Sequence, residues 1–227
     1  MKPVICFGEA LIDFLNIAKH ESDEYNSKPL VLNDYRQFPG GAPANAAVAV
    51  AKLGGKSYFS GQVGNDSFGD FIEQALQAYQ VNTAFLYKHE TAKTALAFVT
   101  LDQAGERSFS FYREQSADVL FTQQQALQLW SSSDSFSQGA VFHFCSNTLT
   151  TTDIANTTLF YVQQAKQHKA LVSFDVNLRH NLWDTGQADL SLVNELVKQA
   201  DIVKFSFEEL DYLSEGAHQS YIQACLT

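Results

Sequence analysis

The chain has 227 residues, of which 45% are apolar and 18% are charged, so its apolar side chains suffice for the core of one large α/β domain. The net charge of −10 disfavours nucleic acid and anionic membranes as partners, and no run of about 20 apolar residues predicts a membrane span. The three cysteines lie far apart and predict neither a disulfide framework nor a zinc site. We therefore expect a cytoplasmic protein with reduced cysteines.

The first part of the chain contains one predicted strand and two predicted helices. Residues 4–7 form a short apolar run that Gly8 ends, which is typical of a strand buried on both faces. An alanine-rich helix is predicted from 44 to 53, with a proline near its first turn and a glycine just past its end. A second helix is predicted from 66 or 67 to 79, because apolar residues recur there at spacings of three and four.

Residues 94–112 change to a period of two on either side of a turn at 103–106, which predicts a β-hairpin. Alternating helix and strand patterns then resume. Helices are predicted at about 122–130, 153–168, 188–200 and from 208, and strands at 140–145, 170–176 and 201–205. We expect a single α/β domain over residues 1–227, with a mostly parallel sheet covered on both faces and a small β excursion at about 94–112.

Two glycines precede the first predicted helix and mark a candidate binding surface. Adjacent glycines such as Gly40 and Gly41 let backbone N–H groups approach a ligand closely, and Asn45 in the first turn offers both donors and an acceptor. This pattern favours a surface that binds hydroxyl groups through hydrogen bonds. Alternatively, the glycines only provide the backbone conformation that starts the helix.

Three charged residues follow predicted strands. Asp13 comes just past the first strand, where an ionised carboxylate can accept hydrogen bonds from two neighbouring sugar hydroxyls. Arg113 follows the hairpin and Arg179 follows the strand at 170–176, where a guanidinium suits a hydroxyl pair, a carboxylate or a phosphate. The alternatives are a helix or turn cap for Asp13 and surface ion pairs for the arginines.

Polar residues also follow the strand at 201–205. Helix N-termini attract phosphate, and a carboxylate nearby can hold Mg²⁺ through water. Composition alone favours the other interpretation, in which Ser206 caps a helix whose first turn is acidic. No P-loop is predicted, because its first glycine is replaced by Val50, and the scattered histidines predict no metal cluster.

Five segments in order resemble the PfkB (ribokinase-like) family of carbohydrate kinases, most closely its fructokinase branch. These segments are residues 8–13, 40–69, 109–113, 175–179 and 204–210, and the resemblance extends over nearly all of the chain. It implies a three-layer α/β fold with a small β lid that includes the 94–112 hairpin. It also implies ATP and Mg²⁺ as cofactors and a small sugar as the substrate.

The resemblance assigns roles to individual residues. Sugar-binding residues would be Asp13, Gly40, Gly41, Asn45, Phe98, Phe111, Arg113 and Arg179. Nucleotide-binding residues would be Asn177, Lys204, Ser206 and Glu209, with Glu209 near Mg²⁺ through an indirect contact. Ser206 stands where the family's Asn-x-x-Glu motif has Asn, which is less specific for the Mg²⁺ role.

The family's Gly-Ala-Gly-Asp segment, whose Asp acts as the general base, does not occur in the 227 residues. We therefore expect an incomplete chain that lacks the last strands of the sheet and contains no catalytic residue of its own. Phosphoryl transfer requires that the attacking hydroxyl be oriented and that the charge on the transferred phosphoryl group be neutralised, so we expect the chain to be inactive alone.

Three functional hypotheses follow. The first is an ATP-dependent kinase that phosphorylates a primary hydroxyl of a ketohexose such as fructose. The second is 2-keto-3-deoxygluconate kinase, because two arginines can clamp a carboxylate. The third is a non-catalytic sugar-binding remnant. For the lid hairpin, an alternative interpretation is a homodimer surface formed by Phe98, Val99, Phe109 and Phe111.

Overall fold

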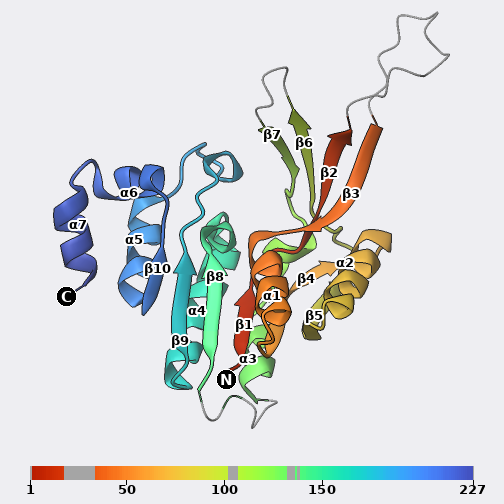
Figure 1. Ribbon diagram of the computed structural model, residues 1–227, viewed down its shortest axis with the longest axis horizontal. Helices are drawn as coiled ribbons and strands as arrows, with labels where there is room; N and C mark the ends of the chain where they lie inside the picture. Colours follow the sequence, from red (N-terminus) through yellow and green to blue (C-terminus); the bar gives the residue numbers. More distant parts are fainter. Residues whose placement is uncertain (1, 18–33, 102–106, 132–135, 137–138, 227) are drawn as a thin grey trace, which may run out of the picture.

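The computed structural model describes residues 2–17, 34–101, 107–131, 136 and 139–226. Its main sheet has six parallel strands in the order β10-β9-β8-β1-β4-β5 (Figure 1). The strands are β1 (Val4–Phe7), β4 (Ser57–Gly64), β5 (Asn82–His89), β8 (Val141–Cys145), β9 (Leu171–Asp175) and β10 (Ile202–Lys204). The predicted mostly parallel sheet is confirmed, although β4 and β5 are not among the predicted elements.

Helices cover both faces of this sheet and make it the middle of three layers. They are α1 (Ala42–Lys52), α2 (Ser67–Ala78), α3 (Gln123–Ser131), α4 (Thr152–Gln167), α5 (Leu190–Gln199), α6 (Phe207–Ser214) and α7 (His218–Cys225). Side chains of β1 alternate between two apolar cores: Ile5 and Phe7 pack with α3, α4 and α5, whereas Cys6 packs with α1 and α2. A strand covered on both sides must be apolar at successive positions, which is the pattern seen at residues 4–7.

A second sheet of four strands forms a lid beyond the carboxyl ends of the main strands (Figure 1). Its order is β3-β2-β6-β7, with β2 (Leu11–Ile17), β3 (Asp34–Gly40), β6 (Leu96–Leu101) and β7 (Arg107–Tyr112). The antiparallel pairing of β6 with β7 confirms the predicted hairpin, and its turn at 103–106 lies outside the described residues. The lid includes this hairpin together with β2 and β3, two strands that were not among the predicted elements.

The first strand, β1, ends before Gly8 as predicted, but Asp13 lies in a different element from the one expected. Gly8 has a φ of 142°, a conformation that L residues with a side chain rarely adopt, and there the chain leaves the main sheet. It enters β2 at Leu11, so Asp13 lies within a lid strand rather than in the loop after β1. Among the described helices, none has the length and apolarity needed to cross a bilayer.

Asp66 connects α2 to the segment that leads into β6, and its removal tests this connection. Its carboxylate caps α2 by accepting from the Gly69 N–H (2.9 Å), and it also accepts from the Thr94 N–H (3.0 Å) and hydroxyl (2.7 Å). Burial would raise the pKa of Asp66, but the hydrogen bonds from Thr94 and Gly69 outweigh burial and lower it. We expect Asp66→Ala to lower the free energy of unfolding by about 1–2 kcal/mol at neutral pH.

This stabilisation should disappear in acid. Because the folded pKa of Asp66 lies below its unfolded pKa, the stabilisation is complete above the unfolded pKa and is lost as the pH falls through the folded pKa. Urea unfolding at a series of pH values measures the difference between wild type and variant, with Glu90→Ala in an exposed loop as the control. A difference that stays constant into strong acid would contradict this account of Asp66.

Candidate functional site

A cavity of about 160 Å³ lies between the lid and the carboxyl ends of the main strands. It gathers polar residues that follow three of these strands, namely Glu9 after β1, Asn147 after β8 and Asn177 after β9. The carboxyl ends of parallel strands are where open α/β sheets bind ligands. Six of the eight predicted sugar-binding residues line the cavity: Asp13, Gly41, Asn45, Phe111, Arg113 and Arg179.

The other two predicted residues do not line this cavity. In the lid, Asp13 pairs with Ala97 and Ala97 pairs with Phe111, so these side chains share the face towards the cavity. Phe98 is the next residue along β6 and therefore lies on the opposite face, where it stacks on Phe14 with ring centroids 5.0 Å apart. The period of two in a strand therefore turns Phe98 away from this cavity, and its predicted contact with the sugar stays a prediction.

Gly40 does not line this cavity, but its lack of a side chain leaves room for a residue that does. A Cβ atom at this position would overlap the Asp13 carboxylate. Gly41 has a φ of 104°, and a Cβ atom there would meet the backbone of Glu9. Both glycines therefore allow the end of β3 and the start of α1 to approach β2 and the segment between β1 and β2 closely, and Asn45 follows one turn into that helix.

Asp13 has an acceptor-rich and partly desolvated carboxylate. It is half-buried, and within the described part of the chain its carboxylate has no hydrogen-bond partner. Burial raises its pKa, and the neighbouring negative charge of Glu9 raises it further. A carboxylate in this state can accept hydrogen bonds from the hydroxyls of a bound ligand.

Arg113 is buried beneath the lid rather than placed on the surface. Its exposed fraction is 6%, and its Nε donates to the Asp118 carboxylate at 2.6 Å. Its Nη2 donates to the Asn147 carbonyl at 2.9 Å, and its Nη1 lies 3.5 Å from the Thr150 hydroxyl. The guanidinium is therefore neutralised within the protein, and the alternative of a surface ion pair is excluded for this residue.

Arg179 differs from Arg113 in being exposed. Its guanidinium donates to the neighbouring Leu178 carbonyl at 2.9 Å, and no ion pair to it occurs within the described residues. Asn177, which precedes Leu178, adopts a φ of 39° in the left-handed region, which Asn tolerates better than most residues. Arg179 is thus the more available of the two cations that line the cavity.

The predicted nucleotide residues gather next to the cavity, around β9, β10 and α6. Ser206 and Glu209 form a capping box, in which the Ser206 hydroxyl accepts from the Glu209 N–H (3.2 Å) and Glu209 Oε2 accepts from the Ser206 N–H (2.6 Å). The interpretation of Ser206 as a helix cap is confirmed. Glu209 Oε1 accepts from the Leu178 N–H at 2.8 Å, while Lys204 pairs with Asp175 at 3.0 Å.

These bonds limit how Glu209 could hold a metal ion. Each carboxylate oxygen already accepts from one backbone N–H group, so a directly coordinated ion would share these oxygens with the Leu178 N–H and the helix cap. In the described ranges, no group of three or more His, Cys, Asp or Glu side chains is arranged to hold a metal. A contact to Mg²⁺ through an intervening water, as the resemblance implies, would leave both hydrogen bonds in place.

Three residues around the cavity were missed as candidates: Glu9, Asp118 and Asn147. Glu9 and Asn147 both directly follow buried strands, a position that alone could have identified them. Asp118 lies in the short helix η1 (Ala117–Leu120) and faces Arg113, a pairing with no local signal in the sequence.

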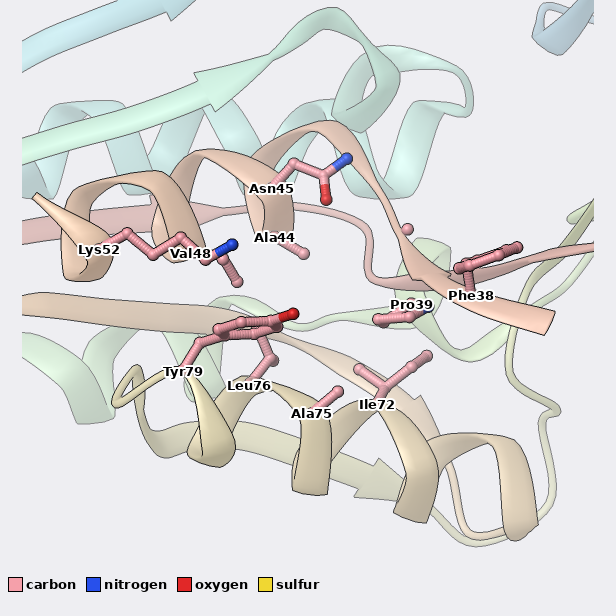
Figure 2. A pocket seen from close by; sticks show the side chains of 11 residues that line it. Phe38, Pro39, Ala44, Asn45, Val48, Lys52, Ile72, Ala75, Leu76 and Tyr79 are labelled. Carbon is pink, nitrogen blue, oxygen red and sulfur yellow. The ribbon is translucent and has the colours of Figure 1, made fainter.

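A second cavity, of about 250 Å³, lies between α1 and α2 below the end of β3 (Figure 2). Figure 2 shows that Val48, Ile72 and Leu76 reach into it, with Phe38 and Pro39 at one end. At the other end the Lys52 ammonium lies 4.4 Å from the centre of the Tyr79 ring. Its mostly hydrocarbon walls cannot satisfy the hydroxyls of a sugar, so the polar cavity under the lid is the better candidate.

The comparisons with known proteins agree on one family. Residues 1–226 match the family described as pfkB family carbohydrate kinase. The chain is 37% identical over 216 residues to a probable chloroplastic fructokinase-6 of Arabidopsis thaliana, which covers 94% of this chain and 53% of the relative. It is 41% identical over 178 residues to a fructokinase of Vibrio alginolyticus, covering 78% of this chain and 56% of the relative.

Solved structures agree with this assignment. The chain is 42% identical to an ATP-bound fructokinase from Xylella fastidiosa, with a TM-score of 0.85 over 99% of this chain and 65% of the other. It is 34% identical to a fructokinase from Vibrio cholerae O395 with bound fructose, ADP and calcium, with a TM-score of 0.81 over 100% of this chain and 67% of the other. The chain spans 53–62% of the length of these and similar curated relatives.

Proposed function

Because the chain belongs to the pfkB family of carbohydrate kinases, we propose that it carries the sugar site of an ATP-dependent fructokinase. The observation that carries this proposal is the half-buried, unpartnered carboxylate of Asp13 in a polar cavity between the lid and the strand ends. The relative from Vibrio cholerae with bound fructose and ADP supports both the choice of sugar and that of the nucleotide.

In this proposal, the residues of the chain bind and orient the sugar. Asp13 accepts hydrogen bonds from two neighbouring hydroxyls, and Asn45 contributes a donor and an acceptor from the first turn of α1. Phe109 and Phe111, stacked with ring centroids 6.0 Å apart, cover the sugar from the lid side and exclude water. When bound, ATP with Mg²⁺ would supply the phosphoryl group and neutralise its charge.

The nucleotide-binding part of the proposal rests on Asn177, Lys204, Ser206 and Glu209 at the ends of β9 and β10. No Gly-Ala-Gly-Asp occurs in the 227 residues, so we propose that these residues alone bind sugar without transferring phosphate. A cytoplasmic location and Mg²⁺ as the metal ion belong to the same proposal.

We also propose that the lid is the surface that meets a second copy of the chain. Tyr112 on the edge strand β7 is 65% exposed, and Phe109 and Phe38 are each 40% exposed. Aromatic side chains on an unpaired strand edge favour association with another sheet.

The alternative substrate, 2-keto-3-deoxygluconate, loses its main argument. The hypothesis was based on a clamp formed by two arginines, and Arg113 is already paired with Asp118. Of the two, only Arg179 remains available to a carboxylate. Fructose therefore fits the described residues better.

The test is phosphorylation by the protein as its gene encodes it, with fructose and 2-keto-3-deoxygluconate as competing substrates. We expect fructose-dependent formation of ADP, with a larger kcat/KM for fructose than for the acid. Preferential use of 2-keto-3-deoxygluconate would replace this proposal with the alternative. Tight fructose binding without ADP formation would instead leave a non-catalytic sugar-binding protein.

A further inference from the structure

Glu9 is a buried carboxylate to which the proposed function gives no role. Its exposed fraction is 2%, and it follows Gly8 where the chain turns out of the main sheet. No salt bridge to Glu9 occurs within the described residues. A buried carboxylate is costly unless hydrogen bonds satisfy it, so its partners indicate why it is there.

The first partner is the start of α1. Glu9 Oε1 accepts from the Ala42 N–H at 3.0 Å, whereas the N-cap residue Gly41 has no side chain with which to cap the helix. The first turn of α1 also contains no acidic residue. Glu9 therefore supplies, from another segment of the chain, the negative charge and the acceptor that a helix N-terminus requires.

The second partner is the loop after β8. Asn147 Nδ2 donates to the same Oε1 atom at 3.0 Å, and the Cys145 thiol lies 3.6 Å from Oε2. Because a carboxylate only accepts, the amide nitrogen of Asn147 must face Glu9. The Asn147 Oδ1 atom is buried and has no hydrogen-bond partner in the described structure, so Glu9 alone orients this amide.

These contacts join two walls of the same cavity. Glu9, Asn147 and the start of α1 all line it, and the Asn147 carbonyl also accepts from Arg113 at 2.9 Å. We propose that Glu9 is a positioning residue, an inference that rests on the proposed function. Its carboxylate joins the start of α1 to the Asn147 loop and so sets the spacing of the groups that bind the sugar.

Replacing Glu9 with alanine removes both hydrogen bonds and tests the proposal directly. In the protein as its gene encodes it, we expect Glu9→Ala to raise the fructose KM on the order of 10- to 100-fold, because displacement of binding groups by a fraction of an ångström is costly. The KM for ATP should stay unchanged, since Glu9 contacts none of the residues proposed for the nucleotide. The exposed helix residue Glu195, changed to Gln, is the control and should match wild type.

Glu9→Gln separates position from charge and remains informative if the alanine variant does not fold. The glutamine oxygen can still accept from Ala42 and Asn147, so we expect the fructose KM to remain within about threefold of wild type at neutral pH. Removal of the charge should also lower the pKa of Asp13, so fructose affinity should persist to a lower pH than in wild type. The other charged groups that line the cavity, Arg113 and Arg179, are unchanged in this variant.

The outcomes distinguish this inference from the proposed function. If wild type itself does not bind fructose, the proposed function fails. If wild type binds fructose and a folded Glu9→Ala variant binds it equally well, the positioning role is overturned while the function stands. A folded Glu9→Gln variant that is as weak as Glu9→Ala, or one with the wild-type pH dependence, would also overturn it.

Discussion

Asp13→Ala is expected to weaken fructose binding by about 1.5–3 kcal/mol, the usual contribution of charge-assisted hydrogen bonds. The carboxylate lines the cavity and has no partner within the described residues, so its removal breaks no contact inside the protein. We therefore expect fructose affinity to fall while the free energy of unfolding changes little. Isothermal calorimetry with fructose and urea unfolding measure these two quantities.

Two further variants sharpen this prediction. Asp34→Ala removes an exposed carboxylate from the neighbouring lid strand β3 and should leave fructose binding unchanged. Asp13→Asn keeps the shape but loses the charge, and it should bind fructose with an affinity between those of wild type and Asp13→Ala. Fructose affinity that is the same in wild type and Asp13→Ala would remove Asp13 from the proposed site.

The pH dependence of fructose binding provides a second readout of the same residue. Burial and then the charge of Glu9 raise the pKa of Asp13, and the ionised form is the one that accepts hydrogen bonds. Fructose affinity should therefore be complete above this raised pKa and fall as the pH drops through it. In Asp13→Asn, fructose affinity should not show this fall at low pH.

Asp118→Ala should have the largest effect on stability, a loss of about 3–5 kcal/mol in the free energy of unfolding. The side chains of Arg113 and Asp118 are 5% and 1% exposed, and their contact at 2.6 Å neutralises the buried guanidinium. Without Asp118, that charge stays buried without its partner, and the Ser116 hydroxyl loses an acceptor. Urea unfolding followed by fluorescence measures the loss.

The matched control is an exposed ion pair in the same protein. Asp70 pairs with Lys88 at 2.6 Å, but the Asp70 side chain is 54% exposed. Water and salt screen such a pair, so Asp70→Ala should cost less than about 1 kcal/mol. Equal losses for Asp70→Ala and Asp118→Ala would show that burial does not govern the strength of these pairs.

Elements with a strong local pattern were predictable from the sequence. The recurrence of apolar residues at spacings of three and four placed α2 within one residue of its observed bounds, Ser67–Ala78. The period of two at 94–112 identified the β6–β7 hairpin. Such patterns can be recognised in a short stretch of sequence because each helix or strand buries one face, and the buried residues recur at the period of that element. β4 was missed because its buried polar residues, such as Ser57 and Gln62, are satisfied by distant partners.

The residues of the site were identified by type and by their place after strands, and six of them do meet in one cavity. Which way they face depends on contacts between distant segments. The pairing of β6 with β2 places Phe98 on the face of the lid away from the cavity. Asp118 neutralises Arg113, and Glu9 joins α1 to the Asn147 loop, although Glu9 and Asn147 are 138 positions apart in the sequence. Local sequence predicts backbone conformation because it depends on neighbouring residues, whereas strand register and the partners of buried charges arise only when remote segments pack together.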